Sequence, residues 1–226
     1  MKFSAILVLF LSYNNYGQSL QKKLEQRKNS SKAPVSVKSE FNRATEELRK
    51  SGIESEALGF GAKLPSFQIG EKSIDEIYKK SPVIIKFYRG HWCPYCIIEL
   101  KEYESKIEEI KRYGSLVVLV PDTKVEILKT KKKHELSFNI YQDKNNQIAK
   151  KLGLAFKVDP KVLELYKNFS IDLEKSQENT NGELPMPGTY VVDKNGKIVY
   201  AFFDADYTKR ADPEKVIKAL KEAANE

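Results

Sequence analysis

The alternation of apolar and polar residues predicts strands and helices through the middle of the chain. Val83 to Tyr88 and Ser115 to Val120 are almost continuously apolar, as expected of strands that are buried on both faces of a sheet. Between them, apolar residues recur at helical spacing up to Tyr113, namely Ile97, Leu100, Tyr103, Ile107 and Ile110. Further on, the pattern predicts a helix from Asp122, an extended segment at 138–141 and a helix at 147–152.

The C-terminal part of the chain predicts a hairpin and a final helix. The strand-like segments TYVVD and KIVYAFF flank the turn KNG. Asp212 and Pro213 suit the N-cap and the first position of a helix. The apolar face of that helix would consist of Val216, Ile217, Leu220 and Ala224. Strands that alternate with helices and end in a hairpin predict an α/β domain with a central mixed sheet.

The segment before this domain is mostly polar, and we interpret it as an N-terminal appendage. KNSSKAP suits a linker, and SEFNRATEELRKSG predicts a helix that Ser39 caps and Gly52 ends. The apolar stripe of this helix, Phe41, Ala44 and Leu48, indicates that it packs on the domain.

The first residues, MKFSAILVLFLSYNNYG, follow the plan of a secretory signal peptide. A single lysine precedes an apolar run, and polar residues follow. The run is too short to span a bilayer, which takes about 20 apolar residues. We therefore predict a signal peptide at 1–17, a linker and helix at 18–52, and a domain at 53–226. The expectation is an exported, periplasmic protein without stable membrane insertion.

Composition places the chain among ordinary globular proteins. It has 226 residues, of which 41% are hydrophobic, and this is enough for one packed core. The formal net charge is +8, and lysines are concentrated in KTKKKHE at 129–135. No mixed aromatic and basic signature of nucleic-acid binding accompanies them, so we expect a solvated helix face and no nucleic-acid partner. The sequence leaves the oligomeric state open.

Both cysteines lie in HWCPYC, directly after the first predicted strand. Pro94 suits the opening turn of the following helix, which places Cys93 at a helix N-terminus. Unpaired N–H groups and the helix dipole favour a thiolate there and lower a cysteine pKa from about 8.5 to between about 3.5 and 7.5. We predict Cys93 as the attacking sulfur and Cys96, one turn later, as the resolving sulfur. Arg89 and His91 add positive charge nearby.

Three other roles for the cysteine pair are less favoured. A structural disulfide closing so short a loop would constrain the unfolded chain very little. A zinc site usually needs four ligands, and His91 and His134 do not form a second pair at ligand spacing. Two inert, buried cysteines fit poorly with Trp-Cys-Pro at a strand-to-helix junction. The expectation is a redox pair without metal or cofactor.

The segment WCPYC resembles the active site of the thioredoxin superfamily. The wider FYRGHWCPYC is similar to the peroxiredoxin-like branch known as the alkyl hydroperoxide reductase and thiol-specific antioxidant family. The similarity runs from about Ser39 to Leu220. GAKLPSF at 61–67 looks like that family's opening strand, LYKNFSIDLEK like its inserted helix, and the stretch from Leu184 onward like its C-terminal half.

The resemblance implies a thioredoxin-like fold, in which helices flank a central mixed sheet, here with an N-terminal helical extension. It also implies that Met186–Pro187 forms the cis-proline turn that faces the cysteines, which makes Pro187 a candidate site residue.

The sequence departs from ordinary peroxiredoxins beside the cysteines. Those proteins carry a Pro and a Thr or Ser seven and three residues before the attacking cysteine, whereas Lys86 and Gly90 stand at these distances from Cys93. The usual hydroxyl that helps to bind the peroxide is therefore missing. Arg89, or Arg210 in DYTKR, could supply the cation that stabilises the thiolate and polarises the O–O bond. For Lys86 we expect snorkelling to the sheet edge, with tuning of the thiolate as the alternative.

Two activities follow, and both use Cys93 first. In a peroxidase, implied by the resemblance, Cys93 attacks a hydroperoxide and becomes a sulfenic acid. It then forms a disulfide with Cys96 that a dithiol such as thioredoxin reduces. In a thiol-disulfide oxidoreductase, Cys93 attacks a protein disulfide and Cys96 resolves the mixed disulfide. A binding module without enzymatic activity is a third reading. We predict a thioredoxin-dependent peroxidase, with disulfide exchange as the alternative.

Overall fold

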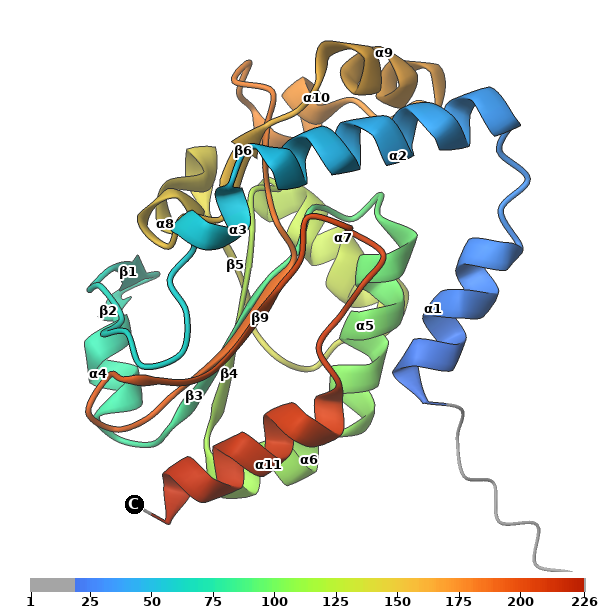
Figure 1. Ribbon diagram of the computed structural model, residues 1–226. Helices are drawn as coiled ribbons and strands as arrows, with labels where there is room; N and C mark the ends of the chain where they lie inside the picture. The colour runs from blue at the N-terminus through green and yellow to red at the C-terminus, as the bar shows by residue number, and fades with distance from the viewer. Residues whose placement is uncertain (1–18, 226) are drawn as a thin grey trace, which may run out of the picture.

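A computed structural model describes residues 19–225, and its centre is a five-stranded sheet in the order β5-β4-β3-β8-β9 (Figure 1). The strands are β3 (Val83–Phe87), β4 (Ser115–Val120), β5 (Ile140–Gln142), β8 (Gly188–Val192) and β9 (Ile198–Phe203). β3, β4 and β5 run parallel, while β8 is antiparallel to both β3 and β9. The predicted mixed sheet, its first two strands and the C-terminal hairpin are confirmed.

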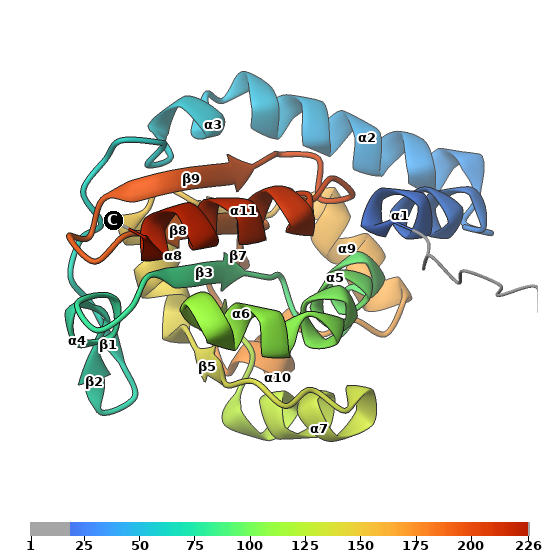
Figure 2. The same cartoon turned by 90° about the horizontal axis from the view of Figure 1, so that it is seen from below.

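One face of the sheet is covered by a layer of helices that carries the cysteines. The layer contains α1 (Leu20–Asn29), α5 (Pro94–Ser105), α6 (Ile107–Tyr113), α7 (Lys124–His134) and α11 (Pro213–Ala224). Figure 2 shows α6 and α11 next to each other on this face. Ile84, Val118 and Val191 of the sheet pack against Leu100 and Leu220 of the helices, so this layer shares one core with the two cysteines.

The opposite face carries shorter elements. α3 (Ile53–Glu56), α4 (Ile74–Tyr78) and α8 (Gln147–Lys151) pack against the alternate residues of the strands, such as Ile85, Leu119 and Tyr190. The 3-10 helix η1 (Lys144–Asn146) precedes α8. β3 is thus apolar on both faces, as its sequence predicted, except at Lys86.

Two small sheets and three further helices complete the described part. β1 (Gln68–Ile69) pairs with β2 (Lys72–Ser73), and β6 (Ala155–Lys157) pairs with β7 (Glu183–Pro185). α2 (Val35–Lys50) lies against α9 (Pro160–Asn168), and α10 (Leu173–Gln177) follows α9. None of the helices within residues 19–225 is long and apolar enough to cross a membrane.

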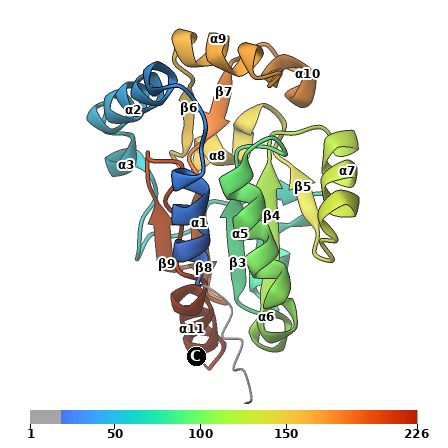
Figure 3. The same ribbon diagram turned by 90° about the vertical axis from the view of Figure 1, so that its right-hand side faces the viewer.

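The N-terminal helices differ from the prediction. α1 was not expected, and it docks on α5 through Leu20 and Leu24, which are buried (Figure 3). α2 begins at Val35 after Pro34, so Ser39 lies inside the helix and does not cap it. The end of α2 is as predicted, since Gly52 follows it with a φ of 83°, a conformation that glycine adopts without strain. The predicted signal peptide at 1–17 lies outside the described residues.

Two segments matched to the family by sequence also differ in detail. The strand expected at 61–67 is absent from the described structure, where Lys63 alone makes an isolated bridge to Lys197. Pro65 has no N–H to donate to a strand ladder, which disfavours regular pairing there. The expected inserted helix is divided into α9 and α10, because Ser170 adopts a left-handed φ of 59° between them.

Candidate active site

The turn between β3 and α5 positions both cysteines. Cys93 is the N-cap of α5 and Pro94 is its first residue, as the sequence predicted. Gly90 permits the turn because a Cβ atom there would lie 2.4 Å from Nε1 of Trp92. Cys96 follows one turn along the helix, and the two sulfur atoms are 2.6 Å apart. The fold therefore presents the thiols as an adjacent pair at the start of a helix.

The two cysteines differ in access. Both are buried, with exposed fractions of 1% for Cys93 and 0% for Cys96. Cys93 lines a cavity of about 340 Å³ together with Trp92, Pro94, Tyr95 and Tyr207, whereas Cys96 is not among the lining residues. A small substrate in this cavity would meet Cys93 first.

Arg210 reaches the pair from the loop before α11. Its Nη2 lies 3.3 Å from Sγ of Cys96, and its Nε lies 2.6 Å from a carboxylate oxygen of Glu99. Nη1 donates to the backbone carbonyls of Tyr207 and Lys209. These contacts hold the guanidinium rigidly beside Cys96, so of the two predicted cation donors, Arg210 is the one that touches a sulfur.

The electrostatics of the pair favour a thiolate at Cys96. Burial alone raises the pKa of Cys96, but the hydrogen bond with Cys93 and the charge of Arg210 outweigh it and lower the pKa to about 6. Burial raises the pKa of Cys93 well above its usual value, and the hydrogen bond with Cys96 raises it further. The sequence had placed the lowered pKa on Cys93. The helix terminus acts on Cys93, but the cation that decides the charge lies against Cys96.

A cluster of buried charges stands behind the sulfurs. Lys86 is fully buried and forms an ion pair with Glu99, while its Nζ also lies 3.1 Å from Oγ1 of Thr189. The expectation that Lys86 snorkels to the edge was wrong, because β3 is the central strand and has neighbours on both sides. Glu99 meets Lys86 and Arg210 at ion-pair distance, but within residues 19–225 its oxygens do not reach hydrogen-bond geometry. Lys86, Glu99, Arg210 and Cys96 therefore form a continuous chain of charged groups.

Arg89 occupies an aromatic cage on the other side of Cys93. Its guanidinium carbon lies 5.1 Å, 5.8 Å and 4.4 Å from the ring centroids of Trp92, Tyr166 and Tyr207. The guanidinium donates to the hydroxyl of Tyr166, while Nε has no hydrogen-bond partner among residues 19–225. Arg89 is almost fully buried and faces the same cavity as Cys93. It is therefore a cation placed beside the accessible sulfur.

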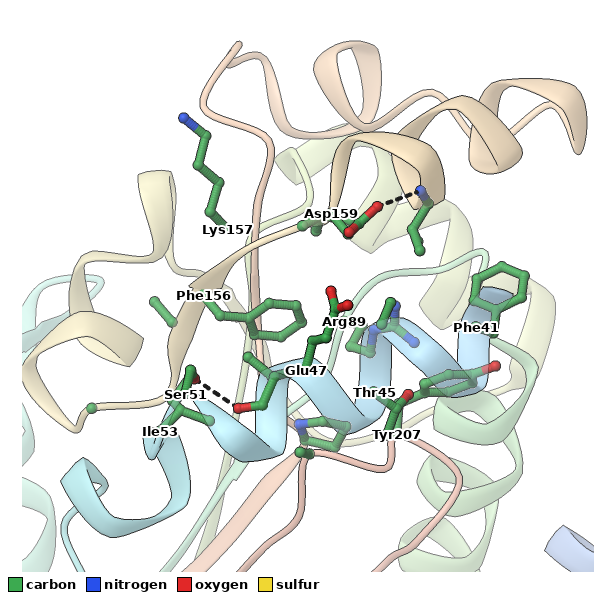
Figure 4. A pocket seen from close by; sticks show the side chains of 18 of the residues that line it. Phe41, Thr45, Glu47, Ser51, Ile53, Arg89, Phe156, Lys157, Asp159 and Tyr207 are labelled. Carbon is green, nitrogen blue, oxygen red and sulfur yellow. Dashed lines mark hydrogen bonds between the residues drawn. The ribbon is translucent and has the colours of Figure 1, made fainter. Parts of the chain in front are cut away.

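A larger cavity of about 650 Å³ adjoins this site between α2 and the segment that contains β6 and the start of α9 (Figure 4). Arg89, Tyr166, Tyr207 and Phe41 line both cavities. Pro187 lines the larger one and is not among the lining residues of the cavity at Cys93. The peptide bond before Pro187 is trans, since the described residues contain no cis peptide bond, and the expected cis-proline turn is therefore wrong.

His91 pairs with a carboxylate and not with a sulfur. Its Nδ1 lies 3.1 Å from Oδ2 of Asp122, and this contact raises the pKa of His91. The backbone N–H of His91 donates to the same oxygen at 2.7 Å, which fixes the turn before Cys93. Within residues 19–225, no group of three or more His, Cys, Asp or Glu side chains is placed to hold a metal ion.

Sequence reasoning missed Glu99 and Tyr166. Glu99 follows Cys96 by three residues and so lies on the same helix face, among buried apolar neighbours. A carboxylate in an apolar helix stripe and a lysine in an apolar strand carry opposite charges. Their presence in the sequence could have predicted the ion pair between Glu99 and Lys86. Tyr166 gave no such signal, because α9 is distant in the chain and only the fold brings it to Arg89.

The fold and the site define a protein with an adjacent pair of buried cysteines on a thioredoxin-like scaffold. The AhpC/TSA family model matches residues 53–201, and the chain belongs to this family. Peroxiredoxin Q, chloroplastic, from Oryza sativa subsp. japonica is 25% identical over 162 residues, which is 70% of this chain and 62% of the relative. The chain thus spans less than two thirds of that relative's length.

Solved structures show the same fold. Peroxidoxin BcpB from Mycobacterium tuberculosis superposes with a TM-score of 0.55 and 15% identity, covering 73% of this chain and 97% of the other. A solution structure from Bacteroides thetaiotaomicron, described as a "putative protein disulfide isomerase", gives 0.52 and 14%, covering 75% and 95%. The fold is therefore shared by proteins with either description and does not by itself choose between peroxide reduction and disulfide exchange.

The predicted export to the periplasm was wrong. The relatives from rice, Sedum lineare and wheat are named as chloroplastic proteins. One lysine and a short apolar run form a weak signal, which does not define a secretory leader by itself.

Proposed function

We propose that this protein is a thiol peroxidase that reduces hydroperoxides through Cys93 and Cys96. The observation that carries the proposal is the pairing of an accessible sulfur with two buried cations. Cys93 lines the cavity beside Arg89, and Arg210 lies 3.3 Å from Sγ of Cys96. Together these groups favour a thiolate next to a site where an O–O bond can be polarised.

Cys93 and Cys96 have different roles in the proposed reaction. The hydrogen bond between the two sulfurs lets the single proton move, so that Cys93 attacks as the thiolate. Cys93 forms an S–O bond, the O–O bond breaks, and the leaving alkoxide takes the proton of the Cys96 thiol and departs as the alcohol. Cys96, now a thiolate, attacks the sulfur of the sulfenic acid and forms the disulfide, while the S–O bond breaks and the hydroxide takes up a second proton and leaves as water. Arg210 assists this second step by stabilising the Cys96 thiolate.

A thioredoxin-like dithiol is the proposed reductant, as the family implies. Its first thiolate would attack one sulfur of the disulfide and its second would release the reduced protein. The cavity at Cys93 is bordered by Arg27 and Lys28 of α1 and by Phe41 of α2. Both helices belong to the proposed appendage at 18–52, which precedes the proposed domain at 53–226. The appendage therefore helps to admit substrate to Cys93 in this proposal.

Disulfide exchange is the second candidate, and one observation favours it. Gly90 stands where ordinary peroxiredoxins have a hydroxyl, so the site has no side-chain hydroxyl at that position to bind a peroxide. In this alternative, Cys93 attacks a protein disulfide and Cys96 resolves the mixed disulfide.

The decisive experiment is stopped-flow oxidation of the reduced protein by hydrogen peroxide and by an organic hydroperoxide. Cys96→Ser should keep rapid formation of a sulfenic acid that a dione reagent traps on Cys93, whereas Cys93→Ser should lose it. Oxidation of the wild type no faster than that of a free thiol would end the peroxidase proposal. Trapping of disulfide-bearing proteins on Cys93 of Cys96→Ser would then support exchange.

A further inference from the structure

Lys86 is an ionisable side chain in the centre of the sheet. It lies in β3 between β4 and β8, with an exposed fraction of 0%. Its ammonium meets the Glu99 carboxylate and Oγ1 of Thr189, and it lies 5.0 Å from the centroid of the Tyr103 ring. The proposed peroxidase steps make no use of it. A lysine at such a position is unusual, because burial disfavours its charged form.

The groups that face Lys86 come from several elements. α5 contributes Glu99 and Tyr103, β8 contributes Thr189, and β4 contributes the apolar Val118 as the register partner of Lys86. The loop before α11 contributes Arg210, and the sulfur of Cys96 lies beyond that guanidinium.

The charges of this cluster balance in only one redox state. Lys86 and Arg210 bring two positive charges, and Glu99 brings one negative charge. A thiolate at Cys96 supplies the second negative charge and makes the cluster neutral. When the sulfurs form a disulfide, the thiolate disappears and one positive charge in the buried cluster has no partner. Arg210 cannot lose a proton, so Lys86 is the group that can.

We propose that Lys86 is a positioning residue that stores a redox-linked proton: it is protonated while the dithiol carries a thiolate and neutral once the disulfide has formed. The inference rests on the proposed redox role of the cysteine pair, but not on a peroxide being the oxidant. With a hydroperoxide, one S–H, one thiolate and the Lys86 ammonium would react with ROOH to give a disulfide, a neutral amine, ROH and water. Two electrons pass from the sulfurs to the O–O bond, and the thiol and Lys86 supply the two protons.

The test is the equilibrium between the protein disulfide and dithiothreitol, followed from about pH 7 to about pH 8, where dithiothreitol stays a dithiol. Reduction of the wild type takes up two protons, one on a sulfur and one on Lys86, and these equal the two that dithiothreitol releases. Its equilibrium constant should therefore not change with pH. In Lys86→Met only one proton is taken up, so the constant should rise tenfold per pH unit.

Lys86→Arg is a second variant for the case that Lys86→Met fails to fold. It keeps the positive charge but cannot release a proton. It should also show the tenfold rise. Lys218→Met, at an exposed position on α11, should behave as the wild type. Equal pH dependence in the wild type and both Lys86 variants would overturn the proposal. Because the equilibrium needs no peroxide, this failure is distinguishable from loss of the peroxidase function.

Discussion

Arg210 and Cys96 are separated by 114 positions in the chain, yet the guanidinium lies 3.3 Å from the sulfur. Glu99 fixes Arg210 from the other side at 2.6 Å. The cation is therefore held in place before any substrate arrives, and the cost of orienting it falls on folding and not on catalysis. This contact makes Cys96 the sulfur on which negative charge is most stable.

Replacing Arg210 should raise the pKa of the thiolate. The pKa of Cys96 is lowered to about 6, and removing a cation within contact distance typically changes such a value by about 1 to 3 units. In Arg210→Met, the ultraviolet absorbance of the thiolate should appear at correspondingly higher pH. Arg210→Lys should retain part of the effect. An unchanged titration in Arg210→Met would contradict the assignment of Arg210 as the stabilising cation.

The stability of the reduced protein should depend on this thiol. Because the pKa of Cys96 falls from 9.0 to about 6 on folding, the folded state binds fewer protons between these values. The stabilisation is fully present above about pH 9 and is lost as pH falls through about 6. The free energy of unfolding in urea should therefore rise over this interval more steeply for the wild type than for Cys96→Ser. Parallel curves would contradict the shift. The pKa of His91 is also shifted, but its titration contributes equally to both proteins and so cancels in the comparison.

The docking of α1 should contribute to stability although α1 lies outside the matched family region. Leu24 is 5% exposed and belongs to the core that contains Tyr95 and Leu100. Leu24→Ala should lower the free energy of unfolding by about 2 to 5 kcal/mol, as measured by urea denaturation. Glu25→Ala, on the exposed side of the same helix, should have little effect. Equal stability of the two variants would mean that α1 does not dock in solution.

The hydroxyl of Tyr166 should matter because it is the acceptor for Arg89. Tyr166→Phe leaves the buried guanidinium with one fewer partner, which should cost about 1 to 3 kcal/mol in unfolding free energy. The variant should also slow peroxide oxidation if Arg89 polarises the O–O bond. Tyr141→Phe, at a partly exposed position, is the matched control. Wild-type stability in Tyr166→Phe would show that the contact is not formed.

The turn before Cys93 should tolerate no side chain at Gly90. An alanine Cβ would lie 2.4 Å from Trp92 Nε1, so the indole would have to leave its place in the cavity wall. Gly90→Ala should therefore change the tryptophan fluorescence, and the chain has one tryptophan to report it. Gly59→Ala, where nothing lies within 4 Å of the new Cβ, should leave the spectrum unchanged. A spectrum of Gly90→Ala that matches the wild type would contradict this packing.

The amino-acid sequence by itself determined the order of the main elements and the place of the thiols. Apolar periodicity is a local property, so β3, β4, the final hairpin and α11 with its Asp212 cap could be predicted. The position of Cys93 at the start of α5 followed from Pro94 in the same way. α1 could not be predicted, because most of its residues are polar and only two leucines dock it on α5.

Only the tertiary structure decided which charges meet. Lys86 lies on β3, Glu99 on α5 and Arg210 before α11, and these residues meet only through the packing of the three elements. The sheet order buries Lys86 between β4 and β8, and packing of α5 on that sheet brings Glu99 to it. Ion pairs between residues distant in the chain depend on this packing, whereas the start of a helix or the apolar pattern of a strand depends on residues that are adjacent in the sequence. For that reason the sequence located the thiol pair, and the fold determined which sulfur holds the charge.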